Sequence, residues 1–470
     1  MLNDELTYRI AQAFAPHLPT DEQRHAIEIF SRFLTDRTPQ SVMILRGSAG
    51  TGKTTLAGAI VRAMIALKQK MVLMAPTGRA AKVFSLYAGQ AASTIHRRIY
   101  RQRSAGDLSA FNLNDNLHGD TLFIVDEASM IGREASNETF GSGSLLDDLI
   151  RYVYEGRNCR LLLIGDRAQL PPVGEEEAPA LSGELLRGYG LKVYECDLNH
   201  VLRQAEQSGI LFNATHIRRM VDSDSLQLPK MRICGFADIC VVPGDELIES
   251  LATSYSRVGI DETIVITRSN KRANIYNQGI RRTVLDREEE LSRGDQLMIV
   301  KNNYRVSEGE LKGVFNGDRG VVQRVRNIRE LYGFRFADIT LLMPDYDNTE
   351  LTATALLDTL ATEAPALPRE AQELLYNKVM EDYADIPLKS ERIKKLKSDA
   401  YYNALQVKFG YAVTCHKAQG GQWAHVYIDQ GYMTDDMFTP DYLHWLYTAL
   451  TRSTEKVFLV NWPKTQVENQ

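Results

Sequence analysis

Short apolar runs alternate with amphipathic stretches through the first 200 residues of the chain. The runs lie at residues 42–45, 71–75, 122–125 and 161–164. Continuous apolar runs of this length are typical of parallel strands that are buried on both faces. Behind the first run, Leu56, Ile60 and Met64 recur at helical spacing. The pattern predicts an α/β domain with a parallel sheet over residues 1–200.

The same alternation returns in the second half, with a long interruption. Its apolar stretches are residues 263–267, 407–413, 426–429, 442–451 and 457–460. A second nucleotide-binding α/β domain is therefore expected from two parts, residues 201–295 and 404–470.

The interruption, residues 296–403, has a different character. Residues 297–343 contain short β-like runs with turn signals, notably Asn316-Gly317-Asp318, and predict a small β-barrel of SH3 size. Residues 350–402 are charge-rich and helical in pattern, broken by prolines. This second part could be a supporting arm or a docking site for a partner, and the sequence does not decide between them.

Composition narrows the class of protein. With 470 residues, 44% hydrophobic and 24% charged, the chain has the make-up of an ordinary globular protein of about three domains. It contains no apolar run near ~20 residues and begins without a signal-peptide layout, so we expect a cytoplasmic protein that does not enter a membrane. The five cysteines form no C-x-x-C pair, which favours reduced thiols. A net charge of −5 means that any polyanion must bind in a local basic groove.

The clearest motif follows the first apolar run. Residues 47–54, GSAGTGKT, fit the pattern G-x-x-x-x-G-K-[ST] between a predicted strand and a predicted helix. Glycines let backbone N–H groups wrap phosphates, Lys53 reaches the β- and γ-phosphates, and the Thr54 hydroxyl is placed for Mg²⁺. We expect ATP and Mg²⁺ to bind here, at Gly47, Ala49, Gly50, Thr51, Gly52, Lys53, Thr54 and Thr55.

Two later strands end in side chains that suit phosphate hydrolysis. Asp126 and Glu127 follow the run at 122–125, and we expect Asp126 to hold Mg²⁺ and Glu127 to polarise the attacking water. Gln169 follows the run at 161–164 and can hydrogen-bond a γ-phosphate or its water. Gln23, near a predicted helix start at Thr20 or Asp21, either reads the base of the nucleotide or faces solvent.

Basic and polar segments follow the second strand. The loop at 76–82 lies on the edge where open α/β sheets bind ligands. Residues 94–101 mix basic and aromatic side chains, which suits contacts to nucleic acid, although such a pattern is more often a solvated helix face. The polar segment 102–120 reads as a loop or hairpin that protrudes from the first domain.

Eight motifs in order resemble those of the superfamily 1 DNA helicases, in particular the RecD-like and Dda-like branch (superfamily 1B) that moves 5′ to 3′. They are GSAGTGKTT, APTGRAAK, STIH, IVDEASMI, GDRAQLPPVG, LNHVLRQ, GYAVTCHKAQGGQW and YTALTRS. The resemblance implies two RecA-like P-loop domains with ATP between them, a strand-separating pin near 101–120 and an SH3-like barrel in the second domain. Phe111 is the residue expected at the aromatic tip of the pin.

Roles carried over from the resemblance complete the predicted site. Gln23 would contact adenine, and Arg203 and Arg452 would be arginine fingers that join Lys53, Glu127 and Gln169 in catalysis. The segments implied to face DNA contribute Pro76, Thr77, Lys82, Thr94, His96, Thr414, His416, Lys417 and Gln419.

The expected function is an ATP-dependent 5′-to-3′ DNA helicase in replication, repair or recombination, with single-stranded and forked DNA as partners. Replication or recombination proteins are further candidate partners, and a monomer is favoured. The alternative is an ATP-regulated subunit of a helicase–nuclease or conjugation assembly. A small-molecule kinase does not account for residues 200–470, whereas an RNA helicase is harder to exclude, because contacts to the backbone discriminate little between RNA and DNA.

Overall fold

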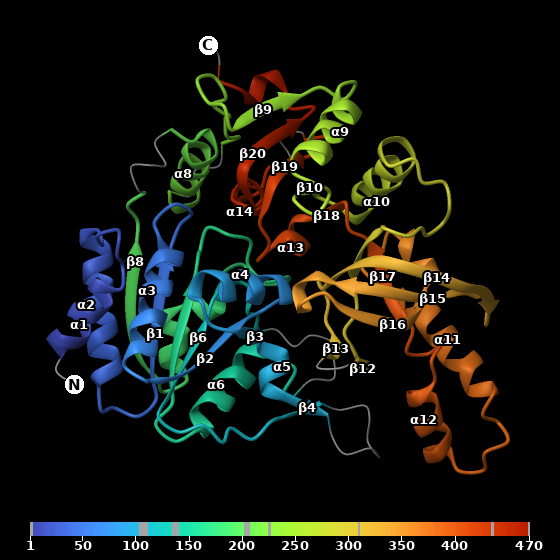
Figure 1. Ribbon diagram of the computed structural model, residues 1–470, viewed down its shortest axis with the longest axis horizontal. Coiled ribbons are helices and arrows are strands. Elements are labelled where there is room, and N and C mark those ends of the chain that lie inside the picture. Colours follow the sequence, from blue (N-terminus) through green and yellow to red (C-terminus); the bar gives the residue numbers. More distant parts are fainter. Residues whose placement is uncertain are drawn as a thin grey trace.

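The computed structural model describes residues 3–102, 111–133, 141–201, 207–223, 227–308, 311–433 and 437–468. It contains two domains with parallel sheets and a barrel inserted in the second of them. In Figure 1 the first domain lies at the lower left, the second above it and the barrel to the right. The predicted α/β fold class is confirmed.

The first domain is built on a six-stranded parallel sheet. In sheet order its strands are β3 (Ala92–Thr94), β2 (Lys70–Ala75), β6 (Thr121–Val125), β7 (Arg160–Gly165), β1 (Ser41–Gly47) and β8 (Lys192–Leu198). Its helices are α1 (Asn3–Gln12), α2 (Asp21–Thr35), α3 (Lys53–Ala66), α4 (Gly78–Ala88), α5 (Ile95–Ile99), α6 (Leu145–Glu155) and α7 (Gly183–Gly188).

Both faces of this sheet are buried, which is why the central parts of strands β1, β2, β6 and β7 are apolar. Along β1, Met43 and Leu45 join the core formed with α1 to α4, whereas Val42 and Ile44 join the core formed with α5 to α7. A strand turns successive side chains to opposite faces, so a strand covered on both sides favours apolar residues at successive positions.

The second domain has a five-stranded parallel sheet. Its strands, in order, are β18 (Ala412–Thr414), β10 (Thr263–Thr267), β19 (Trp423–Asp429), β20 (Ser453–Val460) and β9 (Ile239–Val242). Its helices are α8 (Gly209–Asp222), α9 (Leu247–Arg257), α10 (Asn270–Gly279), α13 (Cys415–Ala418) and α14 (Pro440–Leu450), with a π-helical turn at Ile280–Val284.

The insert contains the predicted barrel. It is closed by β11 (Gln296–Ile299), β14 (Arg319–Leu331), β15 (Phe334–Met343), β16 (Thr349–Leu356) and β17 (Leu405–Phe409). The hairpin of β12 (Asn303–Glu308) and β13 (Leu311–Val314) precedes β14, and α11 (Arg369–Glu381) and α12 (Lys389–Ser398) pack on one end of the barrel through a small apolar core.

Two boundaries inside the insert differ from the prediction. Residues 349–356, expected in the helical part, form β16, and residues 405–409, expected to resume the second domain, form β17. A closed barrel needs partners on both edges of every strand, and β17 completes it by pairing with β11 and β16. Only after β17 does the chain return to the second sheet, at β18.

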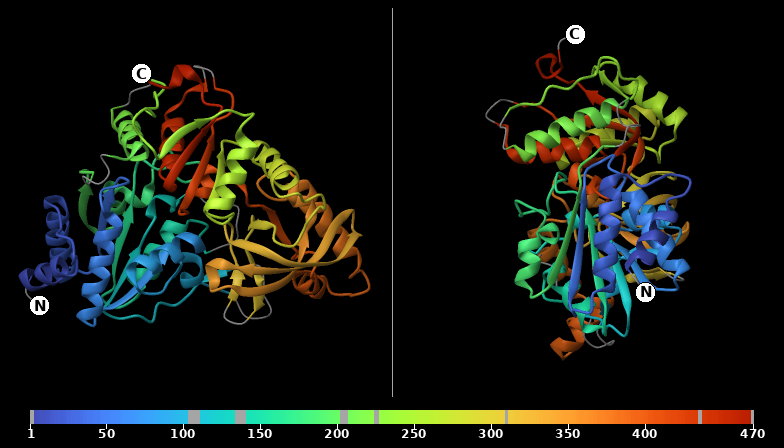
Figure 2. Two further views of the ribbon diagram at one scale, coloured as in Figure 1. Left: turned by 45° about the horizontal axis from the view of Figure 1, so that its top comes forward. Right: turned by 90° about the vertical axis from the view of Figure 1, so that its left-hand side faces the viewer.

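The barrel also touches the first domain. Lys82 of α4 donates a hydrogen bond to the carbonyl of Pro344, and both Figure 1 and the left view of Figure 2 place α4 beside the barrel. Through the described part of the chain, no helix is both long and apolar enough to cross a membrane.

Candidate functional site

A cavity of about 390 Å³ lies between the two domains. The first domain lines it with residues 48–50 and 52–54 and with the ends of β6 and β7. The second domain contributes the start of α8 and residues 451–455, directly after α14. Ligand sites commonly occur at such an interface, at the carboxyl ends of parallel strands.

The phosphate-binding motif has the backbone that its glycines allow. Gly50 and Gly52 have φ angles of 77° and 81°, in the left-handed region that favours glycine, and Gly52 precedes the first turn of α3. Lys53 begins that helix, and its ammonium donates hydrogen bonds to the carbonyls of Gly47 and Ser48. The loop therefore presents N–H groups, a helix N-terminus and a cation to one side of the cavity.

Asp126 and Glu127 follow β6 directly, as predicted. Glu127 has a left-handed φ of 53°, and this strained backbone turns it away from the direction of the strand. The Asp126 carboxylate accepts hydrogen bonds from the Glu127 N–H at 2.9 Å and from the Tyr87 hydroxyl. Burial and the neighbouring Glu127 charge raise the pKa of Asp126 to about 6.

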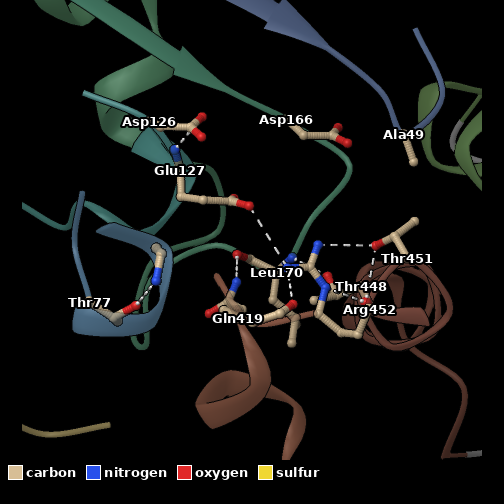
Figure 3. A network of polar contacts seen from close by, with 12 residues as sticks. Ala49, Thr77, Asp126, Glu127, Asp166, Leu170, Gln419, Thr448, Thr451 and Arg452 are labelled. Carbon is tan, nitrogen blue, oxygen red and sulfur yellow. Dashed lines mark hydrogen bonds and ion pairs between the residues drawn. The ribbon is translucent and has the colours of Figure 1, made fainter. Parts of the chain in front are cut away.

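Arg452 crosses from the second domain to meet these groups (Figure 3). Its guanidinium lies 3.8 Å from Glu127 Oε1. In the orientation that satisfies both neighbours, the Gln169 amide donates to Glu127 Oε2 at 3.3 Å and accepts from Arg452 at 3.2 Å. Hydrogen bonds to Thr448 O, Gly421 O and Thr451 Oγ1 hold the arginine in this position.

This set of groups fits a triphosphate with a divalent cation. Backbone N–H groups, Lys53 and Arg452 offer positive charge to phosphate oxygens. The Thr54 hydroxyl and the Asp126 carboxylate line the same cavity and are the hard oxygen ligands that Mg²⁺ prefers. The predicted site residues that line this cavity are Ala49, Gly50, Gly52, Lys53, Thr54, Asp126, Glu127, Gln169 and Arg452.

Two other residues predicted to contact the nucleotide, Gln23 and Arg203, are not seen among these groups. Gln23 is buried, and its amide accepts from Thr20 N, completing the predicted helix cap, and donates to Thr51 O at 3.4 Å. It therefore braces the phosphate loop and does not face solvent, and its amide oxygen and nitrogen both have partners within the protein. Arg203, the second predicted finger, lies outside the described residues.

The segments predicted to face DNA come together where α4, α13 and the barrel meet. Gly420 packs so closely on α4 that an added Cβ would lie 3.2 Å from Thr77 Oγ1. Pro76, Thr77, His96, Thr414 and Lys417 are partly exposed, whereas Lys82 and His416 are exposed. Within the part of the chain that the structure describes, Lys417 Nζ is buried without a hydrogen-bond partner, and burial lowers its pKa to about 8.

Two residues predicted to face DNA are buried, so that prediction is not supported for their side chains. Thr94 caps α5 by accepting a hydrogen bond from Arg97 N. Gln419 donates to the carbonyl of Leu170 at 2.6 Å and so contacts the first domain. Both side chains satisfy backbone groups, which is a structural requirement that the motif does not display.

The predicted pin is an antiparallel hairpin at its base. β4 (Tyr100–Gln102) pairs with β5 (Phe111–Leu113), so Phe111 lies opposite Gln102 in the register. Residues 103–110, which would form the tip, lie outside the described residues.

The prediction missed two side chains of the second domain that contact the phosphate loop. The Tyr447 hydroxyl of α14 accepts a hydrogen bond from Ala49 N at 2.9 Å. Arg218 of α8 donates to Ser48 Oγ at 2.7 Å. Tyr447 lies within the YTALTRS motif, so its position was visible in the sequence, whereas no motif pointed to Arg218.

Comparisons with known proteins agree with this geometry. Residues 19–219 match a family model described as an AAA domain, and residues 409–460 match the UvrD-like helicase C-terminal domain. The ATP-dependent RecD2 DNA helicase of Deinococcus radiodurans is 24% identical over 427 residues, which cover 89% of this chain and 46% of the relative. The ATP-dependent DNA helicase dda of Enterobacteria phage T4 is 24% identical over 298 residues, which cover 60% of this chain and 60% of the relative.

The chain therefore spans about half the length of these curated relatives. Among solved structures, Pif1 helicase from Bacteroides in complex with ADP-AlF3 and ssDNA is 15% identical, with a TM-score of 0.47 over 97% of this chain and 95% of that one. On its ordered motifs, the two family models and these two curated relatives, the chain is similar to the superfamily 1B helicases.

Proposed function

We propose that the protein is an ATP-dependent DNA helicase that moves 5′ to 3′ along single-stranded DNA and separates duplex. The observation that carries the proposal is the meeting of Arg452 from the second domain with Glu127 and Gln169 of the first across the phosphate-loop cavity. A hydrolytic site that two domains share changes when they separate, so hydrolysis can drive their relative motion.

In the proposed reaction, the phosphate-loop N–H groups and Lys53 bind the β- and γ-phosphates of ATP. Glu127 orients the attacking water and accepts its proton, and Gln169 lies beside Glu127 to hold that water or the γ-phosphate. Arg452 stabilises the negative charge that develops during phosphoryl transfer. Mg²⁺, held by Thr54 and Asp126, would neutralise charge on the phosphate oxygens.

Single-stranded DNA is proposed to lie over the surface where the first domain, α13 and the barrel meet. Lys82 and His416, which are exposed, and Lys417, which is partly exposed, are the cationic or polar side chains that would contact its phosphates. Contacts to the backbone carry little sequence information, so unwinding should depend weakly on sequence. We propose that the helicase acts in DNA replication, repair or recombination.

The test is ATP-dependent unwinding of duplexes that carry a single-stranded tail on only the 5′ side or only the 3′ side. Unwinding from the 5′ tail, absent in Lys53→Ala, is the expected result. Unwinding from only the 3′ tail would refute the proposed direction of movement but would still support ATP-driven unwinding.

A second candidate function rests on the charge-rich helices α11 and α12. In this function the protein is a subunit of a larger helicase–nuclease or conjugation assembly, and its ATP site regulates docking. ATP hydrolysis without unwinding of either substrate would favour this second candidate.

A further inference from the structure

Tyr447 is a buried residue of the second domain, and its hydroxyl group contacts the first domain. It is 1% exposed, and its hydroxyl accepts a hydrogen bond from Ala49 N at 2.9 Å and donates one to Asp166 Oδ2 at 2.5 Å. The other Asp166 oxygen accepts from Ala168 N at 3.0 Å, and Lys53 Nζ lies 3.9 Å from the carboxylate. One hydroxyl therefore joins the phosphate loop to the end of β7.

Among the described residues, Tyr447 and two further side chains make polar contacts that hold α14 on the loop after β7. Thr448 Oγ1 accepts from Leu170 N at 2.8 Å, and His444 Nδ1 lies 3.0 Å from Ala168 O. Together they fix the rotation and the position of α14 against residues 166–170.

Arg452 follows this helix directly and depends on it for its own position. Its Nε donates to Thr448 O at 3.1 Å, and Thr448 is the residue next to Tyr447. A shift of the docked end of α14 would therefore move the guanidinium relative to Glu127, to which the distance is 3.8 Å. Displacements of about 1 Å of a catalytic group can cost about 100-fold in rate.

We infer that Tyr447 is a positioning residue for ATP hydrolysis, whose hydroxyl fastens α14 to the phosphate loop so that Arg452 is held against Glu127 and Gln169. The role of Tyr447 rests on the proposed function, because it acts through the proposed finger. Burial and the Asp166 carboxylate raise the pKa of Tyr447 well above its ordinary value, so the hydroxyl keeps its proton and remains a donor at neutral pH.

The chain offers a matched control on the same helix. Tyr442 is also buried, and its hydroxyl donates to Gln430 within the second domain, away from the phosphate loop. Tyr447→Phe and Tyr442→Phe therefore remove the same atom from the same helix. Thr448→Val removes a second docking contact and serves as an independent variant.

The experiment measures ATP hydrolysis at saturating single-stranded DNA, with single-turnover assays for slow variants. Tyr447→Phe should lower kcat about 10- to 100-fold with KM for ATP changed less than about threefold, and Thr448→Val should lower kcat as well. Tyr442→Phe should match the wild type. In the Arg452→Ala background, Tyr447→Phe should cause little further loss, because both changes remove the same function.

A normal kcat in Tyr447→Phe, or losses that multiply in the double variant, would overturn the positioning role while wild-type turnover upholds the proposed function. A wild-type protein with no turnover would refute both.

Discussion

Replacing Arg452 by alanine is the most direct challenge to the proposed hydrolytic site. The residue is 3% exposed, and its guanidinium brings a positive charge from the second domain to within 3.8 Å of Glu127. ATP binding should persist, because the phosphate-loop N–H groups and Lys53 belong to the first domain. Hydrolysis should fail, because the charge that stabilises the transferring phosphoryl group is gone.

The magnitude follows from the role. Arginine fingers contribute about 10³- to 10⁵-fold to kcat in related phosphoryl-transfer enzymes. At about 1.4 kcal/mol for each factor of ten, the barrier should rise by about 4–7 kcal/mol. The variant also loses three hydrogen bonds to its own domain, each worth about 1 kcal/mol, so its melting temperature must be measured beside its activity.

The assay compares single-turnover hydrolysis with equilibrium binding of a fluorescent ATP analogue. Arg272→Ala is the matched control, because Arg272 lies in the same domain but forms its ion pair with Asp429 at 2.6 Å, away from the cavity. Turnover in Arg452→Ala within about tenfold of the wild type, a hundredfold short of the smallest expected effect, would remove Arg452 from catalysis.

Two further predictions concern the barrel and the contact at Leu170. Burial raises the pKa of Asp318 to about 7 from an ordinary 3.8, and Tyr346 and Asp345 are among its polar neighbours. Between pH 3.8 and about 7, the folded protein therefore holds a proton on Asp318 that the unfolded chain has lost. Stability should therefore fall as pH rises through this window, and Asp318→Asn should melt higher than the wild type at pH 8 with a smaller difference at pH 5; parallel melting curves would contradict this. Gln419→Ala should lower the stimulation of ATP hydrolysis by DNA while leaving DNA binding within about threefold, since its amide bonds the Leu170 carbonyl; a large loss of DNA binding would restore Gln419 as a DNA contact.

The parts of the molecule that the sequence predicts well are those whose chemistry is local. Strand, phosphate loop and helix are contiguous, and the carboxylates of Asp126 and Glu127 follow their strand directly. Parallel sheet order then brings such strand ends to one edge without further information.

The failures have a common physical origin in contacts between distant parts of the chain. Gln419 carries the right chemistry for DNA, yet its amide bonds the carbonyl of the distant Leu170. The apolar pattern of strand β17 continues into the second domain. Only its pairing with β11 in the structure reveals that it closes the barrel. Tyr447 and Ala49, 398 residues apart, meet only when both domains are folded.

The loop from Asp166 to Leu170 would join the proposed ATP site to the proposed DNA surface. Gln169 bonds Glu127 and Arg452 on one side, while the Leu170 carbonyl accepts from Gln419, directly after α13, on the other. Helix α13 carries His416 and Lys417, so a shift of the loop when Gln169 changes its partner must move either this helix or the hydrogen bond that holds it. Closely packed interiors deform little and favour discrete arrangements, and the bonds along this loop therefore favour a switch between two positions over a gradual adjustment.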